Sequence, residues 1–255
     1  MYAVIDVRNL RKAYDKIIAV DDLTFAVPGG AVLGLLGGNG AGKTTTLSML
    51  LGLLVPTSGQ IRILGEDMLR HRYRVLPRMN LSSPYVDLPH RLTARQNLAV
   101  YGRLYGVRDL AKRVAELAEQ LNLRDHLDRP FGHLSSGQKT RVTLAKALVN
   151  TPAVLLLDEP TASLDPDTAD WVRTLLKDYQ RQTGATILLA SHNMQEVERL
   201  CDDVILMQTG TVFDRGSPES LISRFGRDSM EEVFLDMARG RKRSVEELRK
   251  VEAVR

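Results

Sequence analysis

The stretch Gly37-Gly38-Asn39-Gly40-Ala41-Gly42-Lys43-Thr44 decides the fold, because it has the G-x-x-x-x-G-K-T form of a phosphate-binding P-loop. The apolar run 31–36 before it predicts a buried strand, and residues 44–51 predict the opening of a helix. Glycines let the backbone curl until successive N–H groups point at phosphate oxygens, and the helix N-terminus adds a positive field. The chain is therefore expected to bind a nucleoside triphosphate.

Two side chains of this loop have specific expected roles. Lys43 is expected to reach the β- and γ-phosphates, and the Thr44 hydroxyl is expected to bind Mg²⁺. A chance glycine-rich turn is the alternative, but the Gly-Lys-Thr ending between a strand and a helix argues against it. The residues expected to contact the nucleotide here are Gly37, Gly38, Asn39, Gly40, Ala41, Gly42, Lys43, Thr44 and Thr45.

A second apolar run, 154–157, ends in Asp158-Glu159-Pro160. It predicts a buried parallel strand that delivers two carboxylates at its C-terminal edge. Asp158 fits the Walker B role of holding Mg²⁺ through water, and Glu159 is then a candidate general base for the attacking water. The same tripeptide also occurs in ordinary turns, and the P-loop is what favours the catalytic interpretation.

The segment Leu134-Ser135-Ser136-Gly137-Gln138 precedes a stretch of helical periodicity, 139–148. It resembles the Leu-Ser-Gly-Gly-Gln signature of ATP-binding-cassette (ABC) proteins, with Ser136 in place of the first glycine of the pair. The Ser135 hydroxyl, the close-approaching N–H of Gly137 and the helix dipole would form a second anion site, which Gln138 completes. One subunit has no second γ-phosphate for it. The resemblance therefore implies a head-to-tail dimer, with ATP between the P-loop of one copy and the signature of the other.

Further elements of the family follow in order along the chain. Ser163-Leu164-Asp165 matches the D-loop, which lines the dimer interface in relatives. His192, after the expected strand 185–191, matches the switch histidine that contacts the γ-phosphate and helps position water and base. Tyr14, before the expected strand 17–27, matches the aromatic residue that stacks on adenine. A lone tyrosine or histidine is more often structural, and the order of the motifs reverses that preference.

One family element is missing. Most relatives carry a glutamine shortly before the Leu-Thr pair that is Leu92-Thr93 here, and it ligates Mg²⁺ and couples the site to a partner. Residues 80–87 read Asn-Leu-Ser-Ser-Pro-Tyr-Val-Asp and contain no glutamine. Ser82 or Ser83 would then have to supply an oxygen to the metal, directly or through water.

Composition agrees with this interpretation. With 255 residues the chain fits one large α/β domain with a modest insertion and tail. No apolar run approaches the roughly 18 to 20 residues that span a bilayer, and the N-terminus has no signal pattern. Cys201 is the only cysteine, so no intrachain disulfide is possible and it is expected to pack as a small hydrophobe in a reducing cytosol. We expect no direct membrane insertion.

The expected fold class is α/β: a P-loop NTPase with the ABC ATPase core, an antiparallel β subdomain and an inserted helical subdomain. The expected ABC ATPase domain spans residues 1–225, with the helical subdomain at about 92–150. The extension 226–255 is expected to hold an amphipathic helix at 229–237 and a basic run at 239–243. A solvated tail explains that run better than lipid or nucleic-acid binding, because no aromatic residues interleave it.

Two functions remain. The first is the ATPase subunit of a membrane transporter, of the exporter-like ABC-2 type. Two copies would dock on separate integral-membrane permease subunits through the surface around residues 80–91, at the cytoplasmic face of the cell membrane. The second is a non-transport ABC ATPase acting on nucleic acid or ribosomes, which a pI near 9.2 leaves open. Such relatives usually carry two cassettes, a coiled coil or a zinc insertion. One P-loop, no heptad run and one cysteine favour transport, with ATP and Mg²⁺ as ligands and no nucleic-acid partner.

Overall fold

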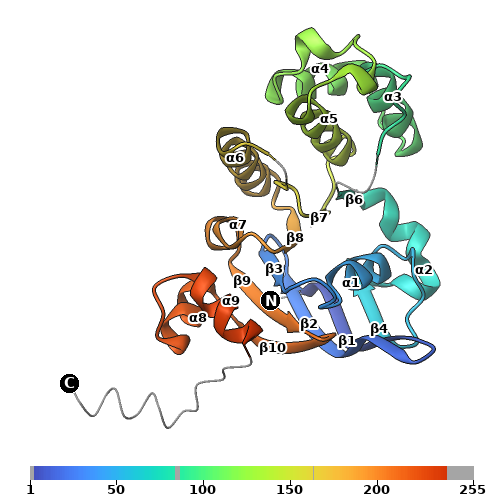
Figure 1. The fold of residues 1–255 in the computed structure, drawn as a ribbon. Helices are drawn as coiled ribbons and strands as arrows, with labels where there is room; N and C mark the ends of the chain where they lie inside the picture. The colour runs from blue at the N-terminus through green and yellow to red at the C-terminus, as the bar shows by residue number, and fades with distance from the viewer. Residues whose placement is uncertain (1–2, 84–86, 163, 240–255) are drawn as a thin grey trace, which may run out of the picture.

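The protein is described here from a computed structural model, which covers residues 3–83, 87–162 and 164–239. Its centre is a six-stranded sheet of order β10-β9-β3-β8-β7-β6 (Figure 1). Neighbouring strands from β9 to β6 run parallel, and β10 is antiparallel to β9. The strands are β3 (Val32–Leu36), β6 (Met79–Ser82), β7 (Val154–Asp158), β8 (Thr186–Ser191), β9 (Asp203–Gln208) and β10 (Thr211–Gly216).

The apolar runs of the sequence form the middle of this sheet because both of its faces are covered. Every residue of β3, β7 and β8 is buried. Side chains alternate between two hydrophobic cores, so Leu155 and Leu157 pack on one side of the sheet while Val154 and Leu156 pack on the other. The α/β class expected from the sequence is therefore present.

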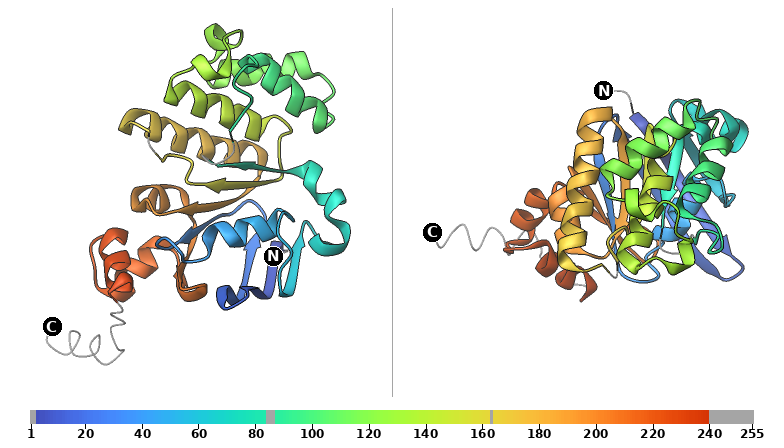
Figure 2. Two further views of the ribbon diagram at one scale, coloured as in Figure 1. Left: turned by 45° about the vertical axis from the view of Figure 1, so that its right-hand side comes forward. Right: turned by 90° about the horizontal axis from the view of Figure 1, so that it is seen from above.

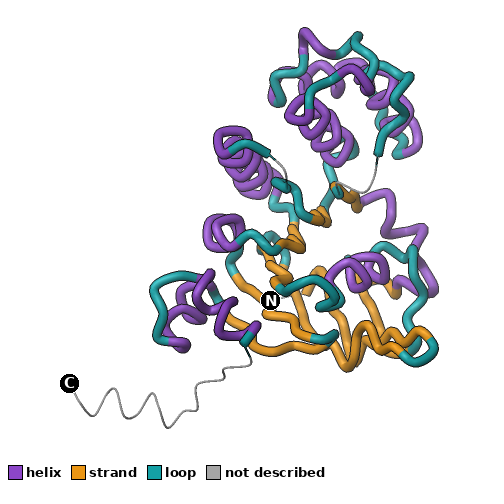
Figure 3. The backbone as a smooth tube through the Cα atoms, viewed as in Figure 1, coloured by secondary structure: helices purple, strands orange, loops and turns teal. Residues whose placement is uncertain are grey.

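A second, antiparallel sheet of order β2-β1-β4-β5 packs against one of these cores (Figures 1 and 3). The second half of its β2 strand alternates, with Leu23, Phe25 and Val27 buried and the residues between them exposed. That pattern is typical of a sheet with one solvated face. The strands are β1 (Ala3–Tyr14), β2 (Ile17–Pro28), β4 (Ser58–Ile63) and β5 (Glu66–Asp67).

Three helices inserted between β6 and β7 form a separate lobe, which stands at the top of Figure 1 (see also Figure 2). They are α3 (Ala94–Leu104), α4 (Leu110–Gln120) and α5 (Ser136–Leu148). Two of them begin with a capping box, Thr93 with Gln96 in α3 and Ser135 with Gln138 in α5. Each box satisfies backbone N–H groups that the first helical turn leaves without partners. The lobe lies within the range 92–150 that the sequence analysis assigned to a helical subdomain.

The remaining helices flank the two sheets. The sequence analysis expected α1 (Lys43–Leu50) and α9 (Met230–Ala238), but it did not anticipate α2 (Met68–Val75), α6 (Pro166–Thr183), α7 (Met194–Leu200) or α8 (Pro218–Phe225). An ion pair between Arg227 Nε and Asp236, 2.7 Å long, ties the loop before α9 to that helix. Most of the basic run 239–243 lies outside the described residues. No helix in the described part of the chain is long and apolar enough to cross a membrane.

The topology gathers the carboxyl ends of β3, β8 and β7 at one edge of the parallel sheet. Leu36 at the end of β3 is level with Ser191 of β8, and Asp158 of β7 is level with Ala190. Ligands of parallel α/β sheets bind at such edges, where strands pass into loops and helix N-termini. The P-loop, the Asp158–Glu159 pair and His192 all follow these strand ends.

Candidate nucleotide-binding and hydrolysis site

The P-loop is a cradle that needs glycine at specific points. A Cβ on Gly37 would lie 2.6 Å from the Met207 carbonyl oxygen, and one on Gly42 would lie 2.6 Å from the Ala19 oxygen, with φ of Gly42 at +98°. A Cβ on Gly38 or Gly40 would instead meet nothing within 4 Å, so the loop is open on that side. The open side faces a cavity of about 350 Å³. Its lining comprises residues 38–45, Asp158, Glu159, Ile17, Ile18 and Ala19.

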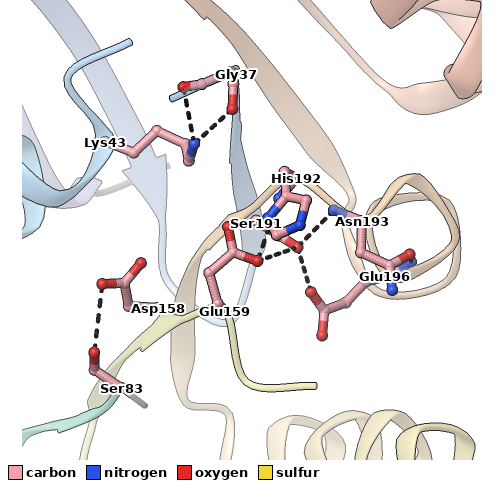
Figure 4. A network of polar contacts seen from close by, with 10 residues as sticks. Gly37, Lys43, Ser83, Asp158, Glu159, Ser191, His192, Asn193 and Glu196 are labelled. Carbon is pink, nitrogen blue, oxygen red and sulfur yellow. Dashed lines mark hydrogen bonds and ion pairs between the residues drawn. The ribbon is translucent and has the colours of Figure 1, made fainter. Parts of the chain in front are cut away.

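Lys43 lies buried beneath this loop. Its Nζ donates to the carbonyl oxygens of Gly37 at 2.5 Å and Gly38 at 3.3 Å (Figure 4). Burial lowers the pKa of Lys43, and the charges of Glu159 and Asp158 oppose that shift. No carboxylate among the described residues lies within ion-pair distance of Nζ. A buried cation held only by carbonyl oxygens, at the floor of an open loop, fits a polyphosphate.

Asp158 ends β7 and is almost fully buried. The Ser83 hydroxyl donates to its Oδ2 at 3.4 Å. Burial raises the pKa of Asp158 and the neighbouring Glu159 charge raises it further, whereas Ser83 and Lys43 lower it. Thr44 and Asp158 both line the P-loop cavity. The described residues contain no cluster of three His, Cys, Asp or Glu side chains that could hold a metal. A carboxylate and hydroxyls beside a phosphate site fit Mg²⁺, because this ion prefers oxygen ligands and keeps waters and phosphate oxygens in its shell.

Glu159, which directly follows Asp158, contacts His192. His192 Nδ1 lies 2.6 Å from Glu159 Oε1, and the His192 backbone N–H donates to Oε2 at 3.4 Å. Glu159 has a left-handed backbone with φ of +49°, and its N–H donates to the Ala190 carbonyl oxygen at 2.8 Å. A non-glycine residue in this conformation carries strain that surrounding contacts must offset, and such residues are frequent at functional sites. The backbone here turns the Glu159 side chain toward both the P-loop cavity and His192.

The signature segment lies apart from the P-loop cavity. The Ser135 hydroxyl accepts from the Gln138 N–H at 3.3 Å, and Gln138 Oε1 accepts from the Ser135 N–H at 3.0 Å. Gln138 thus shapes the helix start, and its Nε2 lies 3.1 Å from His126 Nε2. Ser136 lines a different cavity, of about 250 Å³, and none of Ser135, Gly137 and Gln138 lines the P-loop cavity. Within one chain, the signature segment and the P-loop therefore line different cavities, although Glu159 borders both of them.

The wall of the P-loop cavity that is expected to hold the adenine ring is more apolar than the sequence analysis indicated. Tyr14 ends β1, is half exposed and has Lys12 Nζ 4.9 Å from its ring centroid, but it does not line the cavity. Ile17 and Ile18 do line it, although they are 70% and 44% exposed. Two exposed isoleucines at the start of a strand are the signal that would have identified this wall. The stacking role of Tyr14 stays a prediction.

The D-loop and the end of β8 hold the remaining polar residues near the site. Of the D-loop, Ser163 lies outside the described residues, and Asp165 caps α6 by accepting from the Thr168 N–H at 3.0 Å. The sequence analysis treated Ser191 only as part of a strand and did not consider Glu196. In the structure the Ser191 hydroxyl lies between Glu159 and Glu196 (Figure 4). A serine at the carboxyl end of the apolar run 187–190 was the available signal.

Comparison with known proteins agrees with this geometry. The family model described as ABC transporter matches residues 20–162, more than half of the chain. The Nod factor export ATP-binding protein I of Burkholderia orbicola is 42% identical over 232 residues, covering 90% of this chain and 76% of that protein. The protein of the same name from Ralstonia nicotianae is 38% identical over 235 residues, covering 91% and 73%.

Solved structures give the same result. A structure described as the ATP-binding subunit of an ABC transporter has a TM-score of 0.84 and 26% identity, covering 92% of this chain and 99% of that one. CbiO1 of Clostridium perfringens, part of an ABC transporter complex, has a TM-score of 0.77 and 30% identity, covering 88% and 92%. A dimeric bacterial ABC transporter cassette has a TM-score of 0.77 and 25% identity, covering 84% and 98%. The chain therefore belongs to the ABC transporter family, as an ATP-binding subunit that hydrolyses ATP.

Proposed function

We propose that two copies of this chain form a head-to-tail dimer that hydrolyses ATP with Mg²⁺ and energises export through separate permease subunits. One observation is the main support for the head-to-tail dimer. Asp158 and Glu159 line the P-loop cavity, whereas Ser136 of the signature helix N-terminus lines a second cavity of the same chain, which the P-loop residues do not reach although Glu159 borders both. An anion-binding helix start without a phosphate of its own is explained when a second copy presents one. The dimeric cassette found among the similar structures supports this arrangement.

The proposed chemistry assigns one task to each group. P-loop N–H groups from Gly38 to Thr45 cradle the phosphates, and Lys43 transfers its contacts from the Gly37 and Gly38 carbonyl oxygens to phosphate oxygens. Thr44, Asp158 and Ser83 would hold Mg²⁺, which neutralises phosphate charge when bound. Ser135 and Gly137 would contact the γ-phosphate bound by the other copy, and Tyr14 would stack on the base.

Glu159 is proposed as the general base. An ionised carboxylate only accepts hydrogen bonds, so the 2.6 Å contact to Oε1 requires the His192 tautomer that carries its proton on Nδ1. His192 thereby fixes the orientation of the carboxylate, and Glu159 is left to take a proton from the attacking water. The strained backbone of Glu159 supports a functional role for this placement.

A groove beside β6, separate from the P-loop cavity, is proposed as the permease-docking surface. It has a volume of about 460 Å³ and lies between α2, β6, α3 and α5. Leu53, Tyr73 and Leu104 are about three-quarters exposed there, which is unusual for large apolar side chains on a solvated face. The groove includes Asn80 and Leu81 of the expected surface 80–91 but extends well beyond it; residues 84–86 lie outside the described part.

The occupant we propose is an amphipathic permease segment with a carboxylate. Lys146 lies in the groove, only 6% exposed, with its Nζ donating to the Leu81 carbonyl oxygen at 2.9 Å and to Asn80 Oδ1 at 3.3 Å. No described carboxylate pairs with it, and Tyr101 is the ring nearest its charge, at 5.2 Å. Buried cations are costly unless paired. Docking would also place the chain peripherally at the cytoplasmic membrane face, and the names of the relatives support export.

Site-specific cross-linking tests this function. Cys201 is buried, so Leu53→Cys supplies one accessible thiol in the groove for a photoactivatable reagent. We expect it to cross-link a multi-span membrane protein in native membranes. The matched control is Val212→Cys on β10, which is exposed but lies outside the groove and should give no such product. A ribosomal or nucleic-acid product from Leu53, or equal products from both positions, would contradict the transport function.

A further inference from the structure

A fully buried carboxyl group lies behind the proposed base. Glu196 is on α7 and has no exposed surface. Its Oε2 lies 2.5 Å from the Ser191 hydroxyl oxygen, which is itself fully buried at the end of β8 (Figure 4). The neighbouring His192 belongs to the proposed site, but none of the roles assigned above uses Glu196 or Ser191. A buried ionisable group is costly to retain unless it has a partner.

The Ser191 hydroxyl has three neighbours and one proton. The Asn193 N–H donates to Ser191 Oγ at 3.0 Å and so uses one lone pair. The remaining neighbours are Glu196 Oε2 at 2.5 Å and Glu159 Oε2 at 3.5 Å, and both are carboxyl oxygens. A hydroxyl can donate to only one of them. The hydroxyl therefore serves Glu159 only when Glu196 donates to Ser191.

Two observations indicate that Glu196 is the donor. Its other oxygen, Oε1, is buried and accepts no hydrogen bond of normal geometry in the described residues, and the nearby Thr161 hydroxyl is likewise unpartnered. An unpartnered oxygen is tolerable for the carbonyl oxygen of a neutral acid but costly for a carboxylate. Burial raises the pKa of Glu196; the Ser191 and Thr161 hydroxyls and the more distant Arg173 lower it, and the Glu159 charge raises it. No positive charge forms an ion pair with Glu196 among the described residues.

We propose that Glu196 is a positioning residue: as a neutral acid it donates to Ser191, which in turn donates to Glu159 Oε2. His192 Nδ1 holds the other oxygen, Oε1, at 2.6 Å. The carboxylate of Glu159 is then held at both oxygens, so its orientation toward the water is fixed before nucleotide binds. This inference rests on the proposed base role of Glu159 and adds the reason why that side chain stays in place.

Three variants of the full chain test the relay. Glu196→Gln keeps a neutral donor of the same size, so kcat for ATP hydrolysis should stay within about threefold of wild type. Glu196→Leu removes the donor without adding a buried polar group, and Ser191→Ala removes the link. Each should lower kcat by about tenfold to a hundredfold with KM for ATP within about twofold, because orientation is lost while phosphate binding is not.

The double variant Ser191→Ala/Glu196→Leu should be no slower than the slower single variant, since both act through one contact to Glu159. Glu198→Leu is the matched control. It lies on the same helix, but its carboxylate accepts from the Met230 N–H at 2.7 Å on the tail side, and it should leave kcat unchanged. Thermal unfolding of every variant reports the folded fraction.

The relay is wrong if folded Glu196→Leu keeps wild-type kcat, or if Glu196→Gln loses as much activity as Glu196→Leu, which would mean that the carboxylate form is needed. A failure of the proposed function is a different result. In that case the wild type does not hydrolyse ATP, or Glu159→Gln hydrolyses at the wild-type rate, whatever the behaviour of the Glu196 variants.

Discussion

At the scale of single residues, the proposed site depends on Lys43 and Asp158, which we expect to exchange their present hydrogen-bond partners for the nucleotide and its metal. Lys43 donates to two P-loop carbonyl oxygens, and Asp158 accepts from Ser83. Both ionisable groups are buried. Burial lowers the pKa of Lys43 and raises the pKa of Asp158, so it favours the neutral form of each. A bound triphosphate and its metal would supply the opposite charges that each of them lacks.

Ser83 is the residue that we propose compensates for the missing glutamine. Its hydroxyl contacts Asp158, whereas Ser82 is a member of β6 and is level with Leu157 of β7. Ser83→Ala should raise the Mg²⁺ concentration for half-maximal hydrolysis by about two- to tenfold, as expected for one lost hydrogen bond at the metal site. Titration of Mg²⁺ at saturating ATP measures this. Ser82→Ala is the control, and equal shifts in both variants would remove Ser83 from the metal site.

Lys146 should make stability depend on alkaline pH. Burial lowers the pKa of Lys146 from 10.5 to about 8 in the folded chain. Between these values the unfolded chain binds more protons, so the cost of burying the charge disappears as pH rises through this window. The unfolding free energy of wild type should rise by about 3 kcal/mol relative to Lys146→Met from pH 8 to 10.5.

Urea unfolding of both proteins across this pH window makes the comparison. Lys112→Met, an exposed change on α4, controls for the loss of one positive charge. A wild-type curve parallel to that of Lys146→Met would show that the ammonium group is not desolvated.

The motifs predicted the residues of the site better than they predicted the contacts between them. The P-loop, Asp158, Glu159 and His192 do meet at one sheet edge, because strand ends carry them there. Glu196 could not be predicted, since nothing local distinguishes a buried glutamate on an amphipathic helix from an exposed one. Ile17 and Ile18 were missed for the opposite reason, as apolar strand residues that the fold leaves exposed.

At the scale of elements, the capping box fixes the start of the signature helix α5. The Ser135 hydroxyl and Gln138 side chain satisfy each other's backbone N–H groups. The residue Ser136, which replaces the usual first glycine, is exposed beside this cap. The helix start is therefore preformed, and binding energy need not be used to order it.

Ser135→Arg tests what this element contacts. We expect nucleotide affinity close to that of wild type, because the P-loop cavity is elsewhere, and loss of most hydrolysis, because the long side chain blocks approach to the phosphate of the other copy. Lys43→Ala is the contrasting variant and should lose most affinity, since it removes the cation at the β- and γ-phosphates. Equilibrium binding of a fluorescent nucleotide and an ATPase assay separate the two. Equal loss of binding in both would mean that the sites are not shared between copies.

Elements with strong local signals were predicted closely, and those without were not. The strands β3, β7 and β8 are apolar runs, so their ends agree within one residue with the expected strands 31–36, 154–157 and 185–191. The long helix α6 begins after Asp165 with a proline in its first turn, and α7 after Asn193. Both carry ordinary helix-start signals, but such short signals also occur in loops, and neither helix was predicted.

At the scale of the whole molecule, we propose that one chain carries two half-sites. The helical lobe that bears the signature projects from the edge of the sheet beyond β6 and β7, while the P-loop lies on the body (Figures 1 and 2). Two copies in antiparallel orientation can bring each lobe to the other's P-loop. Every proposed step that follows nucleotide binding depends on that assembly.

The most direct measurement is the molar mass of Glu159→Gln by size-exclusion chromatography with light scattering, with and without ATP and Mg²⁺. The amide cannot accept the proton of the attacking water, so ATP should stay bound and hold both sandwich interfaces closed. We predict about 28 kDa without nucleotide and twice this mass with ATP and Mg²⁺, and a return to monomer when Ser135→Arg is added. A Glu159→Gln chain that binds ATP and remains monomeric would contradict the shared site.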